Sequence, residues 1–186
     1  MNKPVFPVII GSLGLKSVSA SVAALYECAG LLDRKVLMVQ GTGALGIALN
    51  TTSVVRQMAK ALGQDTWRGV FMQDDIYIPM STVRDLANAI TIADKNDLDF
   101  CVPCKQPNGI WNVENGMRDP EYKQLDSWAR VSKSSLQFYY GHLFRDYEYH
   151  EGEHMTGEDW NFYQDNHIDL HVVKLPFKHV KEMLLG

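Results

Sequence analysis

The chain has 186 residues, of which 46% are hydrophobic and 22% are charged, and its net charge is −4 at pH 7. A chain of this length and composition is expected to form one soluble globular domain with a sizeable core. The acidic balance, without any dense run of Lys or Arg, gives no reason to expect nucleic acid as a partner.

The N-terminal segment and the cysteine content bear on where the protein resides. The apolar residues within 1–17 are interrupted by Gly and Ser too soon to form a signal peptide or a membrane span. The chain has three cysteines, and an odd number fits a reducing compartment better than a set of disulfides. We therefore expect a cytoplasmic protein without a transmembrane segment, located in the host cytoplasm if it is viral.

The first half of the chain alternates between predicted strands and predicted helices. Short β-favouring apolar runs predict strands, and apolar residues that recur every three or four positions predict helices. Strands are expected at 7–10, 35–40, 69–78 and 99–103, and helices at 17–33, 54–62 and 82–93, the last with a capping box from Thr82 to Asp85. This alternation predicts a three-layer α/β fold with a largely parallel sheet.

The third predicted strand carries two adjacent acids, Asp74 and Asp75, before Pro79 ends it. Two like charges side by side are costly to bury unless a cation neutralises them. Hard divalent metals with oxygen ligands do this and often take substrate phosphates as further ligands. A strand-to-turn junction with solvated aspartates is the alternative. Ligands of parallel sheets bind beyond the carboxyl ends of the strands, where Ser12, Gly41 and the aspartate pair are expected.

The second half gives weaker signals. Strands are expected at 135–140 and 170–175, a helix at 156–167, and a turn at Asn108-Gly109. Glu158 and Asp159 fall in the first turn of that helix, where the helix dipole keeps a carboxylate ionised, as a general base requires. The same residues also fit a capping box that begins at Thr156. His179, just past the last predicted strand, is either a surface residue or a metal ligand, depending on its neighbours.

A Gly-rich segment after the second strand supports a different function. Gly41, Gly43 and Gly46 form a GxGxxG pattern, which predicts a nicotinamide-dinucleotide site of the Rossmann type. Two features count against it. Residues 47–52 are poor helix starters, and the next acid at a strand end, Asp74, lies well beyond the roughly 20 residues expected.

Two further patterns suggest metal or redox chemistry. His150 to His154 read HExxH, but Gly152 weakens the helix that a zinc site needs, so a polar loop is the better interpretation. Cys101 and Cys104 form a lone CxxC with no second pair to complete a zinc site, which favours buried free thiols.

Taken in order, these motifs resemble the nucleotide-sugar-dependent glycosyltransferases of GT-A fold, most closely the inverting family 2. Residues 41–79 resemble that family's segment from its Asn/Gly-rich loop through its DXD motif, and residues 135–179 resemble its acceptor-side segment. The resemblance implies one GT-A domain over residues 1–186, Rossmann-like, with a mostly parallel mixed central sheet. Its nucleotide-sugar half would cover about 1–105 and its acceptor half about 106–186.

The resemblance also implies an activity. It is the transfer of a sugar, with inversion, from a UDP- or GDP-sugar to an acceptor hydroxyl on a glycan or glycoprotein, with Mn²⁺ or Mg²⁺ bound. Asp159 would be the general base and Glu158 would support the acceptor. The resemblance assigns Asp75 and His179 to the metal. It assigns the following residues to the donor: Ile10, Gly11, Ser12, Gly41, Asn50, Gln73 and Asp74.

Two positions depart from the family pattern. Gln73 replaces the first acid of the DXD motif, so metal contact would rest on Asp75. Gln40 stands where the family carries an acid for the nucleotide, which leaves the base open. A nicotinamide-binding oxidoreductase and a non-catalytic nucleotide- or carbohydrate-binding module remain as alternative functions.

Overall fold

The structure is a computed structural model, and it describes residues 4–11, 19–40, 47–63, 67–103, 134–140 and 171–180. All structural statements below concern these residues. Within these ranges, no helix combines the length and the apolar composition that crossing a membrane requires.

The described elements follow the alternation expected from the sequence in the first half of the chain. In chain order they are β1 (Val5–Gly11), α1 (Ser19–Leu31), β2 (Lys35–Gln40), α2 (Ile47–Leu62), β3 (Arg68–Gln73), β4 (Ile76–Tyr77), a 3-10 turn η1 (Met80–Thr82), α3 (Val83–Asn96), β5 (Phe100–Pro103), β6 (Ser134–Tyr140), β7 (His171–Val172) and β8 (Lys178–His179).

Six of these strands form one sheet in the order β2-β1-β3-β6-β5-β7. β1 is parallel to both β2 and β3, and β5 is parallel to β7. β6 is antiparallel to its neighbours β3 and β5. The prediction of a mixed α/β fold with parallel strands is therefore confirmed for the part of the chain that the structure describes.

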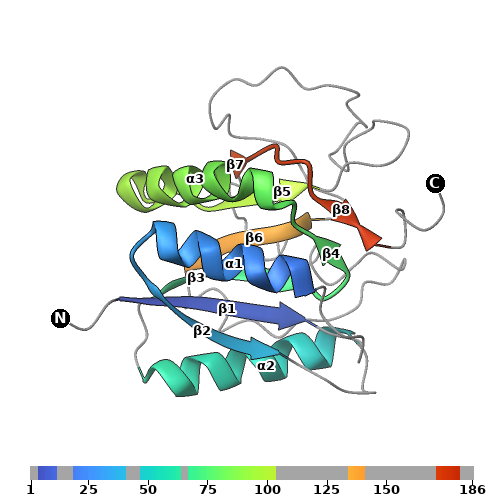
Figure 1. Cartoon of the computed structure of the whole chain (residues 1–186). Coiled ribbons are helices and arrows are strands. Elements are labelled where there is room, and N and C mark those ends of the chain that lie inside the picture. The colour runs from blue at the N-terminus through green and yellow to red at the C-terminus, as the bar shows by residue number, and fades with distance from the viewer. Residues whose placement is uncertain are drawn as a thin grey trace.

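Helices cover both faces of this sheet (Figure 1). α1 and α3 contact each other on one face, and α2 lies against β1 and β2 on the other. Because successive side chains of a strand point to opposite faces, Phe6, Val8 and Ile10 of β1 join the core under α1 and α3. Ile9, between them, is equally buried but is not part of that cluster.

The strand order creates a switch point between β1 and β3. The chain leaves β1 through α1 to reach β2 on one side, then returns through α2 to β3 on the other side. In open α/β sheets the crevice at such a point, beyond the carboxyl ends of the strands, is where ligands bind. In this chain those ends are Gly11 and Gln73, which are paired across the two strands.

Three local predictions are wrong. The capping box is not formed: Thr82 is the residue before α3, but its hydroxyl donates to the carbonyl of Pro79 at 2.7 Å. α2 begins at Ile47, directly after Gly46, although residues 47–52 were expected to start a helix poorly. The strand expected at 170–175 contains only His171–Val172, and His179 lies inside a further strand, β8, rather than past the last one.

Gly69 allows β1 and β3 to approach closely. A Cβ atom at this position would lie 2.7 Å from Cζ3 of Trp67 and 2.9 Å from the carbonyl oxygen of Pro7. A backbone oxygen cannot move aside cheaply, so we expect Gly69→Ala to lower the free energy of unfolding by about 1–3 kcal/mol. Gly30→Ala is the matched control. No atom lies within 4 Å of its added Cβ, and alanine favours helix, so stability should stay the same or rise by up to about 1 kcal/mol.

Urea unfolding of both variants measures these changes. An equal loss of stability in the two variants would contradict the contact that we describe between β1 and β3.

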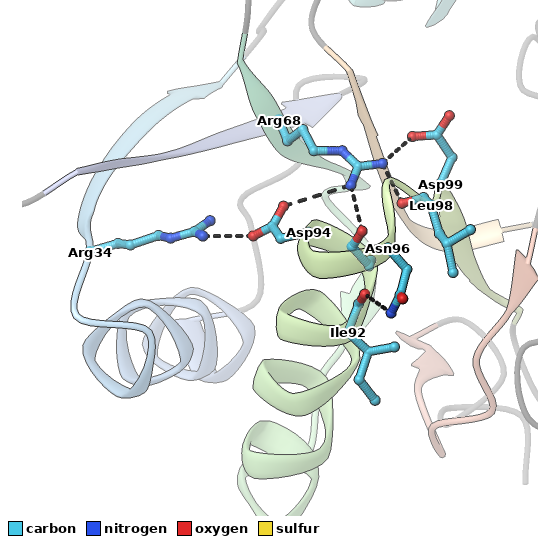
Figure 2. A network of polar contacts seen from close by, with 8 residues as sticks. Arg34, Arg68, Ile92, Asp94, Asn96, Leu98 and Asp99 are labelled. Atoms are coloured by element: carbon cyan, nitrogen blue, oxygen red, sulfur yellow. Dashed lines mark hydrogen bonds and ion pairs between the residues drawn. The ribbon is translucent and has the colours of Figure 1, made fainter.

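A network of ion pairs closes the amino ends of the strands (Figure 2). Arg68, the first residue of β3, donates to Asp99 at 2.8 Å and to the carbonyl of Ala93 at 2.9 Å. Asp94 of α3 accepts from Arg34 at 2.6 Å and lies 3.7 Å from Arg68. These contacts join the C-terminal end of α3 to the starts of β2, β3 and β5. They lie at the end of the strands opposite to the switch point.

The expected buried free thiol is confirmed for Cys101, and Cys28 is likewise buried and not in a disulfide. Burial raises the pKa of Cys28 to about 12, with Arg34 opposing the shift. An unfolded thiol releases its proton near pH 9.0 while the folded one keeps it, so this group should reduce stability as the pH rises from 9.0 to about 12. We expect the unfolding free energy of the unsubstituted protein to fall more steeply over this range than that of Cys28→Ala. Parallel slopes in urea titrations would contradict the assignment.

Candidate functional site

The site begins where β3 ends. The core strand β3 stops at Gln73, Asp74 and Asp75 form a turn, and β4 resumes at Ile76. Ile76 is fully buried, and burial of this side chain fixes the turn against the core. Asp74 is only 5% exposed and the side chain of Asp75 only 13% exposed. Both acids are thus largely removed from solvent at the carboxyl end of β3, as the sequence analysis required for a cation site.

The C-terminal strand β8 brings His179 to this turn. β4 and β8 form a small antiparallel sheet in which Ile76 pairs with His179, and Figure 1 shows it at the end of the main sheet toward which β1 points. Nδ1 of His179 lies 3.1 Å from Oδ2 of Asp75. The His179 side chain is 14% exposed, so it is not the freely solvated surface residue of the alternative interpretation. Two residues from opposite halves of the sequence, each assigned to a metal by the resemblance, therefore face each other.

Ser21 is part of this arrangement, although it was not among the residues predicted from the sequence. It lies in the first turn of α1 and is fully buried. Its hydroxyl donates to the carbonyl of Ile76 at 2.6 Å and accepts from the amide of Ile78 at 2.9 Å. A signal was present, because Ser21 falls on the buried face of α1 and a buried polar side chain is expected to be hydrogen-bonded.

Three further residues predicted to contact the donor lie at the switch point. Gly11 ends β1 beside Gln73, which is partly buried. Ile10 is fully buried in the core under α1 and α3. Its side chain is therefore used for packing, and its backbone lies within the sheet opposite Gln40 of β2 and Met72 of β3.

The remaining predicted residues fall outside what the structure describes. These are Ser12, Gly41, Glu158 and Asp159, together with the HExxH segment, Cys104, Gly43 and Gly46. Asn50 lies in the first turn of α2, where its backbone but not its side chain is described. Their assigned roles stay predictions.

The Asp75–His179 pair has the donor atoms of a divalent metal site. A carboxylate oxygen and an imidazole nitrogen suit Mn²⁺, and carboxylates suit Mg²⁺. The two atoms lie 3.1 Å apart as a direct ion-pair contact, which is also close to the separation of about 3.0 Å between neighbouring ligands of an octahedral ion at about 2.1 Å. Over the described ranges no group of three or more His, Cys, Asp or Glu side chains gathers. Any metal held by this pair would take two protein ligands here and complete its shell from substrate and water.

Comparison with known proteins gives a likeness in fold. No family model matches the chain, and no curated protein sequence matches it significantly. A197 from STIV is similar in structure, with a TM-score of 0.52 and 12% identity, covering 94% of this chain and 83% of that chain. CMP:2-keto-3-deoxy-manno-octonic acid synthetase complexed with CTP gives a TM-score of 0.48 and 11% identity, covering 92% of this chain and 90% of that chain. At such identity the likeness to A197 is one of fold.

Proposed function

We propose that this protein is a divalent-metal-dependent glycosyltransferase that moves a sugar from a nucleoside diphosphate sugar to an acceptor hydroxyl. The observation that carries the proposal is the approach of Asp75 and His179 to 3.1 Å, beside the switch point of the sheet. The resemblance in sequence named these two residues for the metal, and their proximity supports that choice. A switch point is also where a nucleotide is expected in this class of fold.

Asp75 and His179 would hold Mn²⁺ or Mg²⁺ against the diphosphate of the donor. When bound, such an ion neutralises the charge that develops on the nucleoside diphosphate leaving group. Asp74, buried next to Asp75, would face the donor sugar or ribose. Gly11 and Gln73 at the strand ends would approach the nucleotide, and Ser12, Gly41 and Asn50 would complete its binding.

Asp159 would supply the base and Glu158 would support the acceptor. A carboxylate that takes the proton of the acceptor hydroxyl lets that oxygen form a bond to the anomeric carbon as the bond to the diphosphate breaks. Holding both substrates in line avoids the entropic cost of their encounter. A single displacement of this kind inverts the anomeric centre, as in inverting glycoside hydrolysis.

The nicotinamide-binding oxidoreductase is the second candidate, and one observation favours it. α2 begins at Ile47, immediately after Gly46, as a dinucleotide fingerprint requires. However, the fingerprint normally follows the first strand of the unit, and here it follows β2, which is the edge strand of the sheet. This position, away from the switch point, makes the metal-dependent transferase the stronger proposal.

A thermal-shift screen separates the candidates. The ligands are UDP- and GDP-sugars with and without Mn²⁺, and NAD and NADP without metal. A ligand that binds only the folded state raises the melting temperature. We expect a rise with a nucleotide sugar only when Mn²⁺ is present. Stabilisation by NAD or NADP alone would support the oxidoreductase instead. Stabilisation by a nucleotide sugar without release of nucleoside diphosphate, measured in a separate transfer assay, would support the non-catalytic binding module.

A further inference from the structure

We propose that Ser21 is a positioning residue, whose buried hydroxyl fixes β4 against α1 and so sets Asp75 opposite His179. The inference rests on the proposed function for its consequence, metal binding. It rests on geometry alone for the placement of the two side chains. Ser21 would contact neither metal nor substrate.

The hydroxyl of Ser21 acts as a strand partner for one edge of β4. It donates to the carbonyl of Ile76 at 2.6 Å and accepts from the amide of Ile78 at 2.9 Å, so it bridges the two peptide groups on either side of Tyr77. A neighbouring strand would satisfy these groups in an ordinary sheet. Both isoleucines are fully buried, so water would not replace Ser21 without opening the core.

The opposite edge of β4 is the one that pairs with β8 and so brings Asp75 and His179 together. The amide of Val180 donates to the carbonyl of Asp75 at 2.8 Å, and Ile76 pairs with His179. β4 has only two residues, and a pairing this short is not stable by itself. The position of Asp75 therefore depends on what holds β4 from behind, and Ser21 provides two of those bonds.

The choice of residue also points to this role. Alanine would favour the helix more than serine does, and a buried hydroxyl costs free energy unless its hydrogen bonds are made. Serine at a fully buried position of α1 is thus explained by what it binds in β4. Removal of the hydroxyl would leave two buried peptide groups of β4 without this partner.

The test compares Ser21→Ala with Cys28→Ala, a substitution at another fully buried position of the same helix. Two quantities are measured on the full chain: amide hydrogen exchange at Val180, which needs no metal, and Mn²⁺ affinity by electron paramagnetic resonance. Relative to Cys28→Ala, we expect Ser21→Ala to exchange Val180 about tenfold faster. We also expect it to bind Mn²⁺ about tenfold more weakly, as when an outer partner of a metal ligand is lost.

Equal exchange at Val180 in the two variants, after allowance for their global stability, would overturn the inference. If Ser21→Ala does not fold, Ser21→Cys takes its place, because a thiol of similar size is a weaker hydrogen-bonding group. Unchanged exchange at Val180 in that variant would overturn the inference equally. Faster exchange in a protein whose unsubstituted form binds no Mn²⁺ would support the positioning role and contradict the proposed function.

Discussion

Asp75→Asn is expected to abolish the stabilisation of this protein by a nucleotide sugar with Mn²⁺. Asparagine keeps the size of the side chain, but its neutral carbonyl oxygen attracts a hard divalent ion much less than a carboxylate does. Asp75 is largely buried and faces His179, and the described part of the chain offers no cluster of three alternative ligands. The measurement is the Mn²⁺-dependent rise in melting temperature at a saturating donor concentration, which should fall to zero.

Asp94→Asn is the matched control for this substitution. It removes one carboxylate charge from another ion pair, in which Asp94 lies 2.6 Å from Arg34. That pair, drawn in Figure 2, lies where β2 begins, at the end of the strands opposite to Gly11 and Gln73. Asp94→Asn should lower the melting temperature of the free protein and leave the Mn²⁺-dependent rise intact. If Asp75→Asn keeps the Mn²⁺-dependent rise in melting temperature, Asp75 is not a metal ligand.

Asp159→Asn is expected to abolish detectable transfer while donor binding survives. A positioned general base contributes about 10²- to 10⁴-fold to a rate, and an amide cannot accept the proton of the acceptor hydroxyl. The assay pairs sugar transfer, measured as nucleoside diphosphate release, with the Mn²⁺-dependent thermal shift. Glu158→Gln is the neighbouring control. It should mainly weaken acceptor binding, seen as a raised KM for the acceptor.

Asp159→Asn has two outcomes that would contradict the base assignment. If donor binding is lost together with transfer, Asp159 is part of the donor site or is needed for folding. If transfer continues at its original rate, the base lies elsewhere in the chain.

The main sheet could be predicted because its strands carry a local signal. β1, β2, β3, β5 and β6 have four to seven residues each and are rich in apolar or aromatic side chains. β1, β2, β5 and β6 were expected within a few positions of their observed bounds, whereas the strand expected at 69–78 is divided into β3 and β4 by the turn at Asp74 and Asp75. Two of the helices, α1 and α3, bury the faces that their apolar spacing indicates. Such patterns persist because burial of one face is what stabilises each element.

The small sheet of β4 and β8 could not be predicted in this way. Each strand has two residues, too few for any periodic pattern. β4 pairs with β8 through Ile76 and His179, and Ser21 binds β4 from the other side, and both contacts join residues distant in sequence. The likeness to a known family predicted that Asp75 and His179 belong to one site, whereas hydrophobic spacing placed His179 only at the end of an element.

The start of α2 shows the limit of intrinsic helix preference. Asn50, Thr51 and Thr52 are poor helix formers, yet α2 runs through them from Ile47 to Leu62. Differences in preference amount to less than about 1 kcal/mol per residue. Packing of α2 on β1 and β2 outweighs them. The helix ends where Gly63 adopts a φ of +62°, as the sequence indicated.

Pulsed electron paramagnetic resonance of Mn²⁺ bound to the full chain, with a nucleotide sugar present, tests the central claim most directly. If Asp75 and His179 hold the ion, the spectrum will show hyperfine coupling to a histidine nitrogen, and His179→Gln will remove it. A bound Mn²⁺ whose spectrum shows no histidine nitrogen, or shows the same coupling in His179→Gln, would contradict the account.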